Sequence, residues 1–130
     1  MILLDTNICV YLLKARPLSV LARFASYHSG ELAVSVVTAM ELRVGALRAS
    51  NPRRSVEVTG LLAKLHICPL GEDVVEPFAR LKVSLQSAGQ IIGPFDLLIA
   101  AHALTLGATV VTNNMREFQR VPGLKLQNWV

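Results

Sequence analysis

Short apolar runs recur along the chain, separated by longer stretches in which apolar residues are spaced three or four positions apart. The apolar runs predict β-strands at 2–4, 32–37, 66–70, 108–112 and 124–129. The spaced stretches predict helices at 6–14, 18–28, 38–49, 52–65, 72–88 and 95–106, and a short helix follows the polar turn within 112–118. Because strands alternate with helices, we expect an α/β fold, a three-layer sandwich whose central, mainly parallel sheet is flanked by helices.

Start and stop residues support several of these boundaries. Pro17 should end the first helix, Pro94 can open the helix before Asp96, and Gly107 suits the position after its last turn. Thr38 and Glu41 have the spacing of a capping box, which would start the third helix at Thr38.

Length and composition indicate one domain over 1–130 that can bury a core without disulfides. Hydrophobic residues make up 52% of the chain, yet no apolar run reaches the roughly 18–20 residues that span a bilayer. The N-terminus lacks the features of a signal peptide, so we expect a cytoplasmic protein. The apolar excess suggests burial against a partner or a second copy. Cys9 and Cys68 lie in apolar segments without metal-site spacing, which favours buried free thiols.

Four acidic residues occupy corresponding places in their units, just after a strand or in the first turn of the helix that follows. They are Asp5, Glu41, Asp96 and Glu117. Since the carboxyl ends of parallel strands share one edge of a sheet, these carboxylates can converge there.

Each acid also has an ordinary interpretation, which the sequence leaves open. Asp5 could be a helix N-cap, and Glu41 could complete a capping box. Asp96 could interact favourably with the helix dipole in the first turn, and Glu117 could be a solvated surface charge. However, Asp5 and Asp96 stand in strongly apolar segments, where an unpaired charge is costly. Carboxylates that converge repel one another unless a cation intervenes, and hard oxygen ligands suit Mg²⁺ or Mn²⁺. Such a site is suited to phosphodiester hydrolysis.

The distribution of charge fits a nucleic-acid substrate. The formal net charge is +4, and setting the four acids aside leaves five acidic residues against thirteen Lys and Arg. A basic stretch opposed only by Glu57 could hold a phosphate backbone, or could simply be a solvated helix face. It contains Arg43, Arg48, Arg53, Arg54 and Lys64.

Four segments together resemble the signature segments of PIN-domain proteins. They are LLDTN at 3–7, VTAMELRVG at 37–45, GPFDLLIAAHAL at 93–104 and VVTNNMREF at 110–118. The four segments occur in the order typical of the family, and the similarity extends from Ile2 to Trp129. Within the family, the chain is more specifically similar to the VapC toxins of bacterial type II toxin–antitoxin modules.

The resemblance implies a role for each matched residue. Asp5, Glu41 and Asp96 match the family's three acidic metal-site residues, and Glu117 matches a more variable fourth acid, where it replaces Asp. The polar positions that typically support the site correspond to Thr6, Asn7, Thr112 and Asn114. Phe95 stands where relatives often carry Asn or Tyr, and it could shape the substrate path.

The resemblance also implies a function. It indicates a Mg²⁺- or Mn²⁺-dependent endoribonuclease toxin, usually a homodimer, that is inhibited by a VapB-type antitoxin. Such antitoxins lay a helix over the toxin and can insert a basic side chain into the acidic pit, and they make the operator DNA contacts of the complex. Likeness to enteric-type toxins suggests initiator tRNA, cut in its anticodon region, as the RNA substrate.

Other functional classes fit the residues of this chain less well. A haloacid-dehalogenase-type phosphatase needs a second acid at Asn7, and a response-regulator receiver needs a lysine between Lys82 and Lys125, where none occurs. A catalytically silent PIN-fold module acting in a repressor complex stays as the alternative, although intact acids argue against it. A packed or hydrogen-bonded histidine is favoured for His102, and a packing role for Trp129.

Overall fold

A computed structural model describes all residues of the chain, 1–130, and shows one five-stranded sheet. The strands are β1 (Ile2–Leu4), β2 (Leu32–Ser35), β3 (His66–Cys68), β4 (Thr109–Val111) and β5 (Lys125–Gln127). They lie in the order β3-β2-β1-β4-β5, and every neighbouring pair is parallel. The expected parallel sheet is therefore confirmed.

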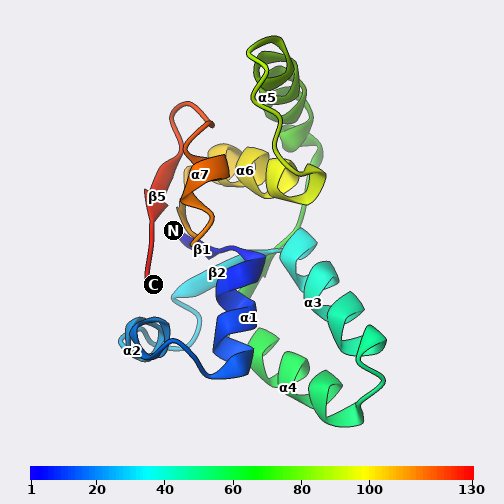
Figure 1. The fold of residues 1–130 in the computed structure, drawn as a ribbon, viewed down its shortest axis with the longest axis vertical. Coiled ribbons are helices and arrows are strands. Elements are labelled where there is room, and N and C mark those ends of the chain that lie inside the picture. The colour runs from blue at the N-terminus through cyan, green and yellow to red at the C-terminus, as the bar shows by residue number, and fades with distance from the viewer.

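Helices connect the strands and cover both faces of the sheet (Figure 1). They are α1 (Thr6–Lys14), α2 (Leu18–Ala25), α3 (Val36–Arg48), α4 (Pro52–Leu62), the 3₁₀ turn η1 (Glu72–Val74), α5 (Val75–Ser87), α6 (Pro94–Leu106) and α7 (Met115–Phe118). No helix of the structure has the length and apolar character needed to cross a membrane.

Two hydrophobic cores lie on opposite faces of the sheet, because neighbouring strand residues point to opposite sides. In β1, Leu3 packs into the core formed with α5, α6 and Phe118, whereas Leu4 packs into the core formed with α1, α2 and α4. Ala33 and Val34 of β2 divide in the same way. This confirms the three-layer sandwich.

Several predicted boundaries were wrong by a few residues. The strand predicted at 32–37 ends at Ser35, and the helices predicted at 18–28 and 52–65 end at Ala25 and Leu62. The helix predicted at 72–88 begins as a 3₁₀ turn. The Gly107 prediction is confirmed, because that residue closes α6 with a positive φ of 65°.

The predicted capping box at Thr38 and Glu41 is also wrong. The N-cap of α3 is Ser35, whose hydroxyl accepts a 3.1 Å hydrogen bond from the Val37 N–H. Thr38 is therefore inside the first turn of α3, and Glu41 lies in the second turn. The carboxylate of Glu41 is consequently free to act elsewhere.

The strand order decides where the connections meet. β1 is central, with β2 on one side and β4 on the other, so the chain switches sides of the sheet between them. In open α/β sheets, the crevice at such a switch point, beyond the carboxyl ends of the strands, is where ligands bind. Asp5 directly follows β1, and Thr112 directly follows β4.

Candidate metal-dependent nuclease site

Asp5 is buried at the carboxyl end of β1, with 2% of its surface exposed. Its Oδ1 caps α1 by accepting a 2.8 Å hydrogen bond from the Ile8 N–H. Burial raises the pKa of Asp5 to about 6, and the charge of Glu41 acts in the same direction. Hydrogen bonds from the Thr112 side chain and from the backbone of Ile8 oppose this increase. Asp5 is therefore both the expected N-cap and a member of a charged group.

Glu41 is held in place from α1. The Thr6 hydroxyl donates a 2.6 Å hydrogen bond to Glu41 Oε1 and lies 3.2 Å from the hydroxyl of Thr38. Thr6 is the first residue of α1, directly after Asp5. The two helices that follow β1 and β2 are thus linked by side chains at the carboxyl edge of the sheet.

Asp96 and Glu117 are brought together by Asn114. The Asn114 amide donates to Asp96 Oδ2 at 3.3 Å and to Glu117 Oε2 at 3.0 Å. Burial raises the pKa of Asp96 to about 6, and a hydrogen bond with Glu117 adds to the increase. The negative charges of Asp5 and Glu41 raise it further, which places all four acids in one electrostatic environment.

No basic side chain neutralises these acids. The one ion pair of the structure joins Arg80 to Glu76, on the exposed surface of α5. The four carboxylates therefore form a negatively charged pit whose charge only protons or a bound cation can offset. Asp5, Glu41 and Glu117 all raise the pKa of Asp96, so the four residues named from the sequence lie within electrostatic range of one another at this edge of the sheet.

The oxygen donors of this pit suit a hard divalent ion. Asp5 and Asp96 would hold such an ion, with Glu41 and Glu117 beside them. No three acidic, histidine or cysteine side chains are gathered closely enough to form a compact ligand cluster by themselves. An ion held here would therefore keep water molecules in its shell, as Mg²⁺ usually does.

The supporting polar residues differ in what they contact. Thr112 is buried, bonds Asp5, and accepts a 2.8 Å hydrogen bond from the Asn114 N–H. Asn7 contributes its backbone to Asp5 while its side chain is exposed. Phe95, next to Asp96 at the start of α6, has 53% of its surface exposed.

The arginines named for RNA binding have different environments. Arg43 is half-buried and joins α3 to α4, because it donates to the Ser55 carbonyl at 3.3 Å and to the Thr59 hydroxyl at 3.0 Å. Arg48 and Arg53 are exposed. These two are better placed to meet a phosphate backbone than Arg43, whose guanidinium already has protein partners.

A cavity of about 310 Å³ opens between α1, α3 and α4, beside the acidic pit. Its lining is largely apolar and includes Val10, Leu13 and Val58, with Thr6 and Glu41 at one part of the wall. Arg54 also lines it. This cavity therefore connects an apolar surface with one of the four acids.

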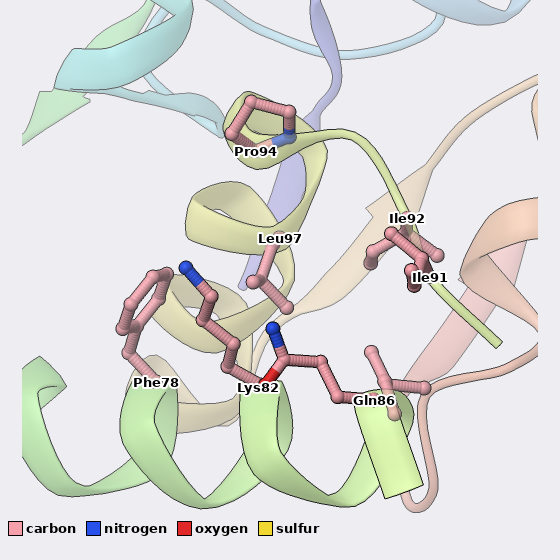
Figure 2. A pocket seen from close by; sticks show the side chains of 8 residues that line it. Phe78, Lys82, Gln86, Ile91, Ile92, Pro94 and Leu97 are labelled. Atoms are coloured by element: carbon pink, nitrogen blue, oxygen red, sulfur yellow. The ribbon is translucent and has the colours of Figure 1, made fainter. Parts of the chain in front are cut away.

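A second cavity, of about 260 Å³, lies away from the acids between α5 and the segment that leads into α6 (Figure 2). Phe78, Lys82 and Gln86 of α5 line one side, and Ile92 and Leu97 line the other. Lys82 Nζ lies 5.9 Å from the centre of the Phe78 ring. Because no acidic side chain lines it, this cavity is separate from the candidate site.

Residues 2–124 match the family model of the PIN domain. The chain belongs to the PIN-domain family. Among relatives of this PIN domain, the ribonuclease VapC2 of Haemophilus influenzae is 40% identical over 129 residues, covering 98% of this chain and 97% of the relative. The tRNA(fMet)-specific endonuclease VapC of Shigella flexneri is 38% identical over 128 residues, covering 98% and 96%.

Solved structures agree with this assignment. The structure of DNA-bound VapBC from Salmonella typhimurium contains a chain that superposes with a TM-score of 0.93 at 34% identity, covering 99% of this PIN domain and 98% of that chain. VapBC2 of Rickettsia felis, bound to a promoter DNA fragment, superposes with a TM-score of 0.90 at 34% identity, with full coverage of both chains. This chain is thus a PIN domain with the fold of the VapC subunits.

The sequence missed one contact near the site and left the partner of another unidentified. It placed Thr38 at a helix start, whereas Thr38 lies beside Thr6 within the site. It favoured a packed or hydrogen-bonded His102, and this is confirmed, because His102 Nδ1 lies 2.8 Å from Ser35 Oγ. A polar residue inside the apolar run IAAHAL was the only available signal, and it could not identify the partner.

Proposed function

We propose that this protein is the toxin of a type II toxin–antitoxin module, a Mg²⁺- or Mn²⁺-dependent endoribonuclease that acts in the cytoplasm and inhibits translation. The observation that carries this proposal is the convergence of Asp5, Glu41, Asp96 and Glu117 without any basic partner. A divalent ion bound there would activate water and offset charge that develops on the phosphodiester.

The protein's own residues hold this arrangement. Thr6 fixes one oxygen of Glu41, and Thr112 bonds Asp5. Asn114 orients Asp96 and Glu117 together. Hydrogen bonds of this kind to ligating carboxylates set their orientation and basicity. The exposed Arg48 and Arg53 would contact the RNA backbone and add a salt-dependent contribution to affinity.

We propose tRNA as the RNA substrate, with the anticodon region of initiator tRNA as the first candidate. The support is the similarity to a relative that is named a tRNA(fMet)-specific endonuclease. Sequencing of RNA 5′ ends after induced expression tests this. New ends that cluster within initiator tRNA are expected, whereas ends spread over messenger RNA would reject the tRNA proposal.

The inhibitory partner would be a VapB-type antitoxin that lays a helix along the cavity between α1, α3 and α4. Apolar side chains of that helix would cover Val10 and Leu13, and a basic side chain would reach Glu41. Operator DNA would be bound through the antitoxin. Leu13→Glu should weaken inhibition by the antitoxin while cleavage by the free toxin is retained.

A second copy of the chain would cover an exposed apolar stripe on α3. Met40, Val44 and Leu47 follow helical spacing and have 53%, 46% and 68% of their surfaces exposed. Light scattering of purified protein should give the mass of a homodimer, and Val44→Glu should give a monomer. Val56→Glu, at a position of α4 with 71% of its surface exposed, is the control and should leave the dimer intact.

The decisive test of the chemistry is RNA cleavage by purified protein, with and without EDTA, beside the Asp5→Asn variant. We expect cleavage by the wild type only when Mg²⁺ or Mn²⁺ is present, and none by the variant. Equal cleavage by the wild type and the variant would reject the assigned site. Absence of cleavage of any RNA by the wild type would favour the catalytically silent repressor module.

A further inference from the structure

His102 is a buried polar residue of α6 that lies six residues after Asp96, on the same helix. Only 1% of its surface is exposed, and its Nδ1 lies 2.8 Å from the hydroxyl oxygen of Ser35. Burial of an imidazole costs free energy unless the ring nitrogens find hydrogen-bond partners. An apolar side chain would occupy this volume at a lower desolvation cost, so a buried imidazole here indicates a specific role for its polar atoms.

Ser35 occupies the junction between β2 and α3. Its hydroxyl oxygen accepts a 3.1 Å hydrogen bond from the Val37 N–H and thereby caps α3. Glu41 is carried by the same helix, in its second turn. The contact between His102 and Ser35 therefore joins the helix that carries Asp96 to the start of the helix that carries Glu41.

The surroundings of the ring favour its neutral state. Burial lowers the pKa of His102, and the backbone of Pro69, just after β3, opposes that decrease. Asp73 of η1 is the acidic residue that acts on the ring from a neighbouring element. Because Ser35 Oγ already accepts from the Val37 N–H, its own hydroxyl hydrogen can be donated to an unprotonated Nδ1, which leaves the proton of the neutral ring on Nε2.

We propose that His102 is a positioning residue whose neutral ring, bonded to Ser35, fixes the start of α3, and with it Glu41, relative to Asp96. The inference rests on the proposed function for its catalytic consequence and on the described contacts for its structural one. It assigns His102 to no proton transfer and to no contact with RNA or metal.

Three variants separate positioning from packing. His102→Phe keeps a ring of similar shape but removes the hydrogen bond to Ser35, and Ser35→Ala removes the same contact from the other side. His102→Asn places an amide oxygen near the former Nδ1, where it can accept from Ser35. Val20→Ala, a buried α2 position with no exposed surface, is the control for general loss of stability.

We expect His102→Phe to lower kcat about ten-fold or more with KM changed by less than about three-fold, as loss of a supporting hydrogen bond typically does. His102→Asn should recover most of kcat, and Ser35→Ala should add little when combined with His102→Phe. Val20→Ala, assayed well below its melting temperature, should keep kcat. Equal loss in Val20→Ala, or no recovery in His102→Asn, would overturn the proposal.

Two measurements do not depend on catalysis. Nitrogen NMR of labelled histidine should show a single His102 tautomer with the proton on Nε2. Amide hydrogen exchange at Val37 and Thr38 should accelerate at least about ten-fold in His102→Phe but not in Val20→Ala. Unchanged exchange in His102→Phe, or a proton on Nδ1, would overturn the positioning role even if the wild type cleaved no RNA. Absent cleavage with the expected exchange would instead refute only the proposed function.

Discussion

The Thr6 hydroxyl donates a 2.6 Å hydrogen bond to Glu41 Oε1, although 35 positions separate the two residues in sequence. Thr6 begins the helix after β1, and Glu41 lies in the helix after β2, which is the parallel neighbour of β1. The bond therefore exists because the sheet places the carboxyl ends of these strands side by side. It fixes a carboxylate that a divalent ion would otherwise have to order.

Replacing Thr6 by Val should lower RNA cleavage roughly 10–100-fold, the usual cost of removing a side chain that orients a metal ligand. The isosteric methyl group keeps packing but cannot donate to Glu41. Thr6→Ser is the matched control and should retain activity within a few-fold, because it keeps the hydroxyl. Steady-state cleavage of RNA by both variants provides the comparison, and equal activity of the two would dismiss the Thr6–Glu41 bond as a contributor.

Asp5→Asn should abolish cleavage and leave the fold intact. Asn caps helices about as well as Asp, so the hydrogen bond from Ile8 can persist. The variant removes a buried charge whose pKa is raised from 3.8 to about 6, and it should therefore be more stable at pH 8, by up to roughly 3 kcal/mol. Urea unfolding followed by circular dichroism measures this. A collapsed spectrum for Asp5→Asn would instead assign Asp5 a purely structural role.

The metal-free protein should become more stable as the pH is lowered from about 8 to 5. Asp5 and Asp96 have folded-state pKa values of about 6, above their ordinary value of 3.8. Between these values the folded state binds more protons than the unfolded state, so the free energy of unfolding falls as pH rises. Urea titrations across this range test the slope. The Asp5→Asn/Asp96→Asn double variant should show a flatter slope, and an unchanged one would contradict the raised pKa values.

Divalent ions should reverse that pH trend. Mn²⁺ binds the ionised carboxylates, so its stabilising effect should be large at pH 8 and should decline as the pH falls through 6. Melting temperatures with and without Mn²⁺ provide the measurement. Asp96→Asn should lose most of the Mn²⁺ effect and all detectable cleavage, whereas Glu117→Gln, which still can bond Asn114, should lose less. If Mn²⁺ stabilised Asp96→Asn as much as the wild type, the ion would have to bind at another site.

Arg48→Ala/Arg53→Ala should weaken RNA binding and flatten its salt dependence, because each lost phosphate contact removes counterion release. A reduction of about 1–2 in the slope of log affinity against log salt is expected. Arg80→Ala/Lys82→Ala removes the same charge from α5, away from the acidic pit, and should leave the slope unchanged. An identical effect in both double variants would show that only net charge matters.

The local patterns were sufficient for the elements and for the list of acids. Alternation of apolar runs with helical spacing gave α1 and β1 with their observed bounds, and Pro94 and Gly107 correctly delimited α6. These features depend on short-range steric and capping preferences, which a sequence displays directly. Three of the four acids were found because they follow a strand, and a parallel sheet brings such positions to one edge. Asp96 was found because it opens a helix within a strongly apolar segment.

Tertiary structure decided which groups touch. Sequence spacing paired Glu41 with Thr38 in a capping box. In the structure, Ser35 at the end of β2 is the N-cap of the helix, and Glu41 instead accepts a hydrogen bond from Thr6. The raised pKa values of Asp5 and Asp96 and the contact between His102 and Ser35 likewise arise from burial among elements distant in sequence. The chain alone determined which side chains could form a charged site, because local propensity fixed their elements. The order of strands in the sheet determined that they meet, because only packing across the molecule sets distances between residues far apart in sequence.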